Sequence, residues 1–232
     1  MNTDLSCHPT TDILNDYVQG NLSTGLSVAL SAHLELCKGC KQKFAELESS
    51  IVSTWAQGLS VESTSDFSHL MANIVNQPQV DNNDSVSQQS PIAKIHMLDH
   101  SFTLPQILAK AANEGLVWKK LAGGITQAKV DIDSQTQCEF VYMSPGSKTP
   151  PHKHQGSEIT LVLDGSFSDE SGTYEAADFI VRSGKEEHQP ISEEGCLCFA
   201  VLDSPLTFTR GLARIFNPIN RYRFRKTIAH QS

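Results

Sequence analysis

No stretch of this sequence is long and apolar enough to cross a membrane, and its start does not look like a secretion signal. A membrane-spanning helix needs about 20 mainly apolar residues, and no run in the chain approaches that length. The N-terminus, MNTDLSCHPTTD, lacks both the basic cluster and the apolar segment of a signal peptide. We therefore expect a cytoplasmic protein that does not bind a membrane.

Positive charge is scarce in the first 90 residues, which hold three Lys against ten Asp and Glu. The rest of the chain is almost balanced, with 15 Lys and Arg against 16 Asp and Glu, so the net charge of −8 arises mainly in the N-terminal part. An acidic surface repels nucleic acid and attracts a basic partner protein, although solubility alone would also account for it. We expect no direct contact with nucleic acid.

Disulfides are not expected either, although the chain has six cysteines. In a reducing compartment, cysteines are free thiols or metal ligands rather than disulfides. The apolar fraction of 39% and the charged fraction of 19% are those of an ordinary globular protein.

A polar segment divides the chain into two parts. The stretch NQPQVDNNDSVSQQSP has almost no apolar residue, and this composition is typical of a linker. We predict a first domain at residues 1–76, a linker at 77–91 and a second domain at 92–232.

The two predicted domains differ in periodicity. In the first, apolar residues recur at helical spacing, which predicts an all-α unit with helices at 13–18, 26–34, 40–47 and 66–75. The second has one helical segment, at 105–114, and then short apolar runs separated by Gly, Pro, Ser and Asp, which predict an antiparallel sandwich or barrel. In the run RYRFR, Arg alternates with Tyr and Phe, so we predict a last strand with one basic face.

The first candidate metal group combines His33, Cys37 and Cys40. On a helix, residues i and i+4 share a face, so His33 and Cys37 can point at one ion. A Cys-x2-Cys pair is the usual thiolate arrangement for zinc, and a structural zinc site needs four ligands. Either Cys7 or His8 is the fourth.

At these residues the sequence resembles the zinc-binding anti-sigma domain, in which an upstream His is followed by H-x3-C-x2-C. The segment HPTTDILNDYVQGNLSTGLSVALSAHLELCKGC is similar to that domain nearly throughout. The resemblance favours His8 over Cys7 as the fourth ligand. It implies a helical bundle that is stabilised by a structural zinc ion and binds an alternative sigma factor. A bundle of this size has a small hydrophobic core, so a metal ion would add the stability that the core lacks.

The second candidate metal group is His152, His154 and Glu158, flanked by Gly146 and Gly165. The three ligands have the same parity, so on a continuous strand their side chains project from one face, which is the interior of a small barrel. Two imidazoles and a carboxylate could converge on a metal there.

This spacing, including both glycines, resembles the first motif of the cupin family. The second cupin motif should supply one more histidine, and His188 in DFIVRSGKEEHQP is the candidate. Arg182 stands where the family usually has Pro, the spacing after Gly184 is loose and the expected Asn is missing, which puts His188 in doubt. Zinc, iron and manganese all accept this ligand set, and the resemblance favours zinc.

Cys196 and Cys198, in GCLCFAVLD, share a face if they lie on one strand. Their ordinary interpretation is two small buried apolar residues. The functional interpretation is an oxidant-sensitive pair near the second metal group.

A zinc-binding anti-sigma domain followed by a cupin is the architecture of ChrR-type anti-sigma factors, and the resemblance covers nearly the whole chain. It implies an α+β multidomain fold, with a zinc-stapled helical bundle followed by an all-β cupin barrel, the double-stranded β-helix. The implied protein is no enzyme. It sequesters an extracytoplasmic-function sigma factor and releases it on an oxidative signal, of the singlet oxygen or organic peroxide type, sensed by the cupin. The alternative is a cupin metalloenzyme, a dioxygenase or isomerase, with a helical appendage.

Overall fold

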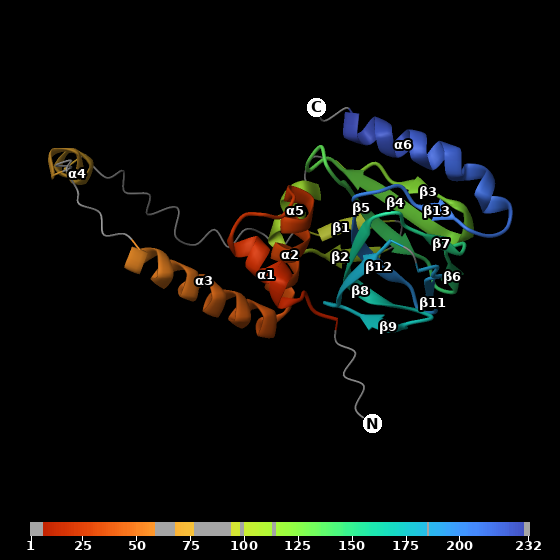
Figure 1. The fold of residues 1–232 in the computed structure, drawn as a ribbon. Helices are drawn as coiled ribbons and strands as arrows, with labels where there is room; N and C mark the ends of the chain where they lie inside the picture. The colour runs from red at the N-terminus through yellow and green to blue at the C-terminus, as the bar shows by residue number, and fades with distance from the viewer. Residues whose placement is uncertain are drawn as a thin grey trace, which may run out of the picture.

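The computed structural model describes residues 7–58, 68–76, 94–97, 100–112, 115–184 and 186–229. The predicted linker at 77–91 lies outside these residues, and so do Asp66 and Phe67 at the start of the fourth predicted helix. Figure 1 shows a helical N-terminal part followed by a curled, mainly antiparallel β structure.

The helices of the N-terminal part agree with the periodicity of the sequence. They are α1 (Thr11–Val18), α2 (Thr24–Leu36), α3 (Lys38–Gly58) and α4 (Ser68–Val75). The side chains of Thr10 and Ser23 cap α1 and α2 by accepting hydrogen bonds from backbone amides three residues later. Gly20, at a φ of +75°, lets the chain turn sharply after α1.

The β structure is one long antiparallel sheet with smaller pairs beside it. Its elements, with the short helices between and after them, are β1 (Lys94–Met97), β2 (His100–Thr103), α5 (Gln106–Ala112), β3 (Lys119–Lys120), η1 (Ala122–Gly124), β4 (Ile125–Val130), β5 (Gln137–Met143), β6 (Ser147–Lys148), β7 (His152–Lys153), β8 (Ser157–Asp169), β9 (Gly172–Glu175), β10 (Phe179–Ser183), β11 (Ile191–Ser192), β12 (Cys196–Leu202), β13 (Thr207–Phe208), η2 (Leu212–Phe216) and α6 (Asn217–Ala229). The strand order is β3-β4-β5-β12-β8-β11-β6, and β9 and β10 also pair with β8.

The middle of the sheet is its most buried part. All of β12 is buried, because its apolar run CLCFAVL lies between β5 and β8 and α2 packs against it. Gly165, one of the two motif glycines, has a φ of +71°, and a Cβ there would collide with the backbone of Gly195 and Cys196. Only glycine allows the two strands to approach so closely at this bend.

The prediction of a last strand at RYRFR is wrong, because this segment lies in the helix α6. Pro218 lies in the first turn of α6, where proline's fixed φ suits a helix. The Asn217 side chain bonds both the N–H and the C=O of Phe208, and so holds the start of α6 against β13. Phe224 is buried while Tyr222 is exposed, which is a helical and not a strand pattern.

The N-terminal helices and the barrel share one hydrophobic core. It joins Leu14, Leu30 and Leu34 to Phe140, Phe179 and Phe199. Two carboxylates connect the parts further, each at a helix start. Asp133 accepts a hydrogen bond of 2.5 Å from the Gly25 N–H of α2, and Glu35 accepts bonds of 2.7 and 3.2 Å from the first two N–H groups of α5. The barrel therefore caps α2, and α2 caps α5.

Beyond its first turn α3 extends away from the barrel, and the whole of α4 lies apart from it (Figure 1). They carry exposed apolar side chains: Val52 and Trp55 on α3, and Leu70, Met71, Ile74 and Val75 on α4. Side chains of this size seldom stay exposed in groups unless they bind a partner.

Candidate metal sites

The structure brings His8, His33, Cys37 and Cys40 together. One possible ligand atom from each lies within 4.8 Å of those of the others. His33 is in the last turn of α2, and Cys40 is in the first turn of α3. Cys37 ends α2 with an extended backbone, but its N–H still donates to the His33 carbonyl, so the i, i+4 relation is kept.

His8, and not Cys7, completes this group. His8 Nδ1 lies 3.7 Å from Cys37 Sγ, and the rings of His8 and His33 are in contact. The Cys7 side chain packs instead against a second apolar cluster in the barrel, and its carbonyl accepts a hydrogen bond from the Phe179 N–H. The geometry therefore agrees with the choice that the family resemblance favours.

The N-terminal group fits a metal ion. His33 is fully buried, burial lowers its pKa to about 4, and its Nε2 has no hydrogen-bond partner. A buried imidazole nitrogen without a partner is costly, and a bound cation would satisfy it. Burial and the contact with Cys37 raise the pKa of Cys40 to about 11, and a divalent cation would counter this by binding the thiolate. Two sulfurs and two imidazoles are a tetrahedral zinc set.

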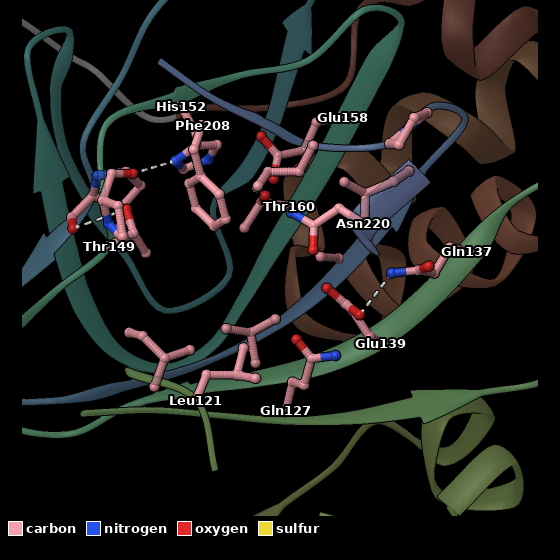
Figure 2. Close-up of a pocket in the computed structure, with 18 of the residues that line it drawn as sticks. Leu121, Gln127, Gln137, Glu139, Thr149, His152, Glu158, Thr160, Phe208 and Asn220 are labelled. Carbon is pink, nitrogen blue, oxygen red and sulfur yellow. Dashed lines mark hydrogen bonds between the residues drawn. The ribbon is translucent and has the colours of Figure 1, made fainter. Parts of the chain in front are cut away.

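The second group, His152, His154, Glu158 and His188, also converges within 4.8 Å. His154 Nε2 lies 2.9 Å and His188 Nε2 3.6 Å from Glu158 Oε2. His188, the ligand that the sequence leaves in doubt, is placed by the backbone, because His152 and His188 exchange both of their N–H···O=C bonds. Figure 2 shows His152 and Glu158 facing the same space.

The strand that carries this group is not continuous as predicted. β7 ends at Lys153 and β8 begins at Ser157. Gly156 lies in the break, where a Cβ would collide with the Asp203 carboxylate. The ligands therefore converge because the chain bends around the barrel, and the shared parity of their numbers is not the cause.

The second group fits a metal ion as well. Nε2 of His154, Nε2 of His188 and Oε2 of Glu158 are buried and have no hydrogen bond of good geometry, although two of these atoms are only 2.9 Å apart. The other ring nitrogen is already used in two imidazoles, since Nδ1 of His152 bonds the Pro150 carbonyl and Nδ1 of His188 faces Asp169. That arrangement leaves Nε2 free to bind an ion.

The charges in this group also suit a cation. Burial lowers the pKa of His152 to about 4. Burial alone would raise the pKa of Glu158, but the neighbouring His154, His152 and His188 lower it to about 2. The group therefore presents the neutral imidazole of His152 and the carboxylate of Glu158. Zinc, iron and manganese all accept a set of histidines with one carboxylate.

A cavity of about 440 Å³ adjoins the second group. Its wall is mainly apolar, and α6 forms part of it through Ile219, Asn220 and Phe224. A polar corner holds Gln127, Gln137 and Glu139 (Figure 2). The size and lining are those of a small-molecule site.

Glu139 is a cavity residue that the sequence reasoning missed. It is buried, burial raises its pKa, and its carboxylate accepts a hydrogen bond of 2.9 Å from the Gln137 amide. The signal was a glutamate inside the apolar strand CEFVYM, where an ionisable residue must face either solvent or a polar interior site.

Cys196 and Cys198 lie side by side on β12, with their sulfurs 4.0 Å apart. A shift in register between Leu197 and Cys198 marks an irregularity of this strand. Both residues are buried, and Cys198 lines the cavity next to the second group. A hydrogen bond from Cys198 lowers the pKa of Cys196, while the same contact and burial raise the pKa of Cys198.

Comparison with known proteins agrees with this arrangement. Residues 109–204 match the family model of the ChrR cupin-like domain. The fold class is an α+β protein with a helical N-terminal part and a cupin barrel, as predicted. The described part of the chain contains no helix that could span a membrane.

Among individual proteins, the chain is similar to the anti-sigma-E factor ChrR of Cereibacter sphaeroides. The two are 28% identical over 217 residues, which are 92% of this chain and 97% of that protein. The structure is also similar to a chain in the crystal structure of Rhodobacter sphaeroides SigE in complex with the anti-sigma ChrR. The TM-score is 0.67 and the identity 26%, over 85% of this chain and 98% of that one. The resemblance to ChrR-type anti-sigma factors is therefore confirmed.

Proposed function

We propose that this protein is an anti-sigma factor that sequesters an extracytoplasmic-function sigma factor in the cytoplasm. The observation that carries the proposal is the similarity to ChrR over nearly the whole chain, together with the fold shared with one chain of the SigE–ChrR complex. Both relatives are regulators by name, so we assign no catalytic activity. The alternative of a cupin dioxygenase or isomerase loses support because the similarity includes the helical part as well as the barrel.

The sigma factor would bind to the exposed apolar faces of α3 and α4. Val52, Trp55 and the four exposed apolar residues of α4 offer the large side chains from which protein interfaces draw most of their energy. The excess of acidic residues in the first 90 positions would favour a partner with a basic surface.

In this proposal the two metal groups have different roles. Zinc held by His8, His33, Cys37 and Cys40 would staple α2, α3 and the N-terminal segment into a binding unit. Zinc, or else iron or manganese, held by His152, His154, Glu158 and His188 would belong to a sensor. We keep the proposed division into a first domain at 1–76, a linker at 77–91 and a cupin domain at 92–232.

The signal in this proposal is an oxidant of the singlet oxygen or organic peroxide type. The cavity beside the second group would admit a small apolar hydroperoxide. Cys198 lines this cavity, and its sulfur lies 4.0 Å from that of Cys196. Oxidation of the pair to a disulfide would release two protons and two electrons, which reduce the hydroperoxide to an alcohol and water. The two sulfurs would move from 4.0 Å to bonding distance. Because α2 packs against β12, that movement would shift α2 and lower the affinity of the helical part for the sigma factor.

Co-expression with each extracytoplasmic-function sigma factor of the source genome, followed by affinity purification, tests the proposal. We expect one of them to co-purify in a defined ratio. Trp55→Ala should weaken binding about 30-fold or more, as truncation of a central interface aromatic does. Tyr222→Ala is the matched control, because Tyr222 on α6 is as exposed as Trp55, at 68% and 65%. If no sigma factor binds, the proposal is wrong. Equal loss in both variants would contradict the assigned surface.

A further inference from the structure

One short segment of the barrel touches the N-terminal metal group. The Ala177 carbonyl, in the turn between β9 and β10, accepts a hydrogen bond of 2.9 Å from His33 Nδ1. Two residues later, the Phe179 N–H donates to the Cys7 carbonyl, next to His8, at 2.8 Å. The barrel therefore holds two of the four N-terminal ligands in place, one through its ring and one through its backbone neighbour.

Strand β10 begins at Phe179, and its far end reaches the second metal group. Arg182, near the end of β10, forms an ion pair with Asp169 and donates a hydrogen bond of 2.9 Å to the Tyr174 hydroxyl. Asp169 also faces His188 Nδ1 at 3.4 Å. Asp169 is fully buried as a side chain, so its contacts are not weakened by solvent. Arg182 and Asp169 thus connect β10 to a ligand of the barrel group.

The turn that presents the Ala177 carbonyl is strained. Ala177 has a φ of +76°, and among the described residues it is the only non-glycine residue at positive φ. Such a conformation costs about 1 kcal/mol or more for a residue with a Cβ. Hydrogen bonds on both sides hold it, from the Ala177 N–H to Val162 and from the Glu175 N–H to the Asp178 carboxylate. Strain kept in this way at a contact with a candidate ligand indicates that the carbonyl position matters.

We propose that Ala177 is a positioning residue for the N-terminal metal group, and that the segment from Ala177 to Arg182 couples this group to the barrel group. The Ala177 carbonyl fixes the His33 ring so that Nδ1 carries the proton and Nε2 faces the ion. A displacement of His188 or Asp169 is passed along β10 to that carbonyl. The inference rests on the proposed function, because it names the route by which a signal in the cupin reaches the sigma-binding unit.

The test uses the purified full-length chain loaded with Co²⁺. Cobalt bound by thiolates has a charge-transfer absorption band, and Cys37 and Cys40 are the thiolates of the two candidate groups. The band therefore reports on the N-terminal group, and the double variant Cys37→Ser with Cys40→Ser should abolish it. Competition with a chelator then gives the metal affinity and the rate of metal loss.

Two pairs of variants separate positioning from coupling. Ala177→Val places a β-branched residue at positive φ and should weaken cobalt binding about 10-fold, whereas Ala177→Gly accepts that φ and should bind like the wild type. Asp169→Asn touches none of the N-terminal ligands, yet should release the thiolate-bound cobalt several-fold faster. Asp164 is an exposed residue of β8, the strand that also carries Asp169, and Asp164→Asn should leave the rate of cobalt release unchanged. Because Asp169→Asn leaves the turn residue intact, it tests the coupling even if the valine variant does not fold.

The outcomes are distinct. Wild-type cobalt binding in Ala177→Val overturns the positioning role, and equal rates in Asp169→Asn and Asp164→Asn overturn the coupling. Absence of the band in the wild type overturns the metal group itself. None of these results depends on sigma-factor binding, so failure of the inference is distinguishable from failure of the proposed function.

Discussion

The two metal groups are assembled alike, from three ligands close in sequence and one remote histidine, but they differ in ligand chemistry and in what surrounds them. Three of the N-terminal ligands lie within eight positions of one another, and the group contains two thiolates and is partly exposed. The barrel group likewise has three ligands within seven positions, but it is almost entirely buried and contains no sulfur. A closed set of soft ligands suits a structural ion, whereas a buried set beside a cavity suits an ion that meets small molecules. This difference supports the proposed structural role for the first group and the proposed sensor role for the second.

The largest effect is expected from loss of an N-terminal ligand. Cys37→Ala should remove one metal equivalent per chain and unfold the helical part, because the binding energy of a structural ion is folding energy. Sigma activity should become constitutive. Metal analysis, circular dichroism and a reporter gene measure these changes.

Cys7, the residue next to the candidate ligand His8, provides the control. Cys7→Ser should keep the metal and the fold, while His8→Ala should lose both. Metal loss in Cys7→Ser with retention in His8→Ala would reverse the assignment of the fourth ligand.

Loss of the barrel group should be selective. His152, His154 and Glu158 replaced together by Ala should lose the second metal equivalent and the response to oxidant, yet keep sigma binding. Metal content, co-purification and regulon induction are the readouts, and His96→Ala, an exposed histidine of β1, is the control. Induction of the regulon by oxidant in the triple variant would contradict a sensor role for the barrel.

The contact between the two parts can be broken at one glycine. A Cβ on Gly25 would collide with Thr136 Oγ1 and Cys138 Sγ of the barrel. Gly25→Ala should therefore lower the free energy of unfolding by about 2 kcal/mol, as overpacking does. Gly39→Ala is the matched control, because nothing lies within 4 Å of a Cβ there. Chemical denaturation compares the two, and equal stability would mean that α2 does not pack on the barrel as the structure has it.

A smaller effect is expected at Asp133, which caps α2. Asp133→Asn should cost about 1 kcal/mol. Burial acts to raise the pKa of Asp133, but its hydrogen bonds from Gly25, Gln135 and Thr136 lower it below its usual 3.8. A lowered folded-state pKa gives stability that is fully present above pH 3.8 and is lost only as the pH falls through the folded value. The deficit of the variant should hence be the same at pH 8 and pH 5. A deficit that shrinks between these values would show that another group is responsible.

The structure bears out most of what local patterns predict and corrects the patterns that depend on context. Helical periodicity located α1 to α3, and buried apolar runs located β5, β8 and β12. The alternation in RYRFR failed because a period of two over five residues cannot tell a strand from a helix that buries only Phe224. Equal parity predicted that these candidate ligands converge in the barrel, but for an incomplete reason, since the strand breaks at Gly156.

The sequence by itself determined the fold class, the family resemblance and the eight candidate metal ligands, because those signals lie in short spacings that local geometry preserves. Only the tertiary structure decided between His8 and Cys7 geometrically, brought His188 to the barrel group and placed Glu139 in the cavity. It also showed that the barrel caps α2 through Asp133 and holds His33 through the Ala177 carbonyl. These contacts join residues more than 100 positions apart, and each of them uses a backbone atom, so no pattern of side chains could reveal them.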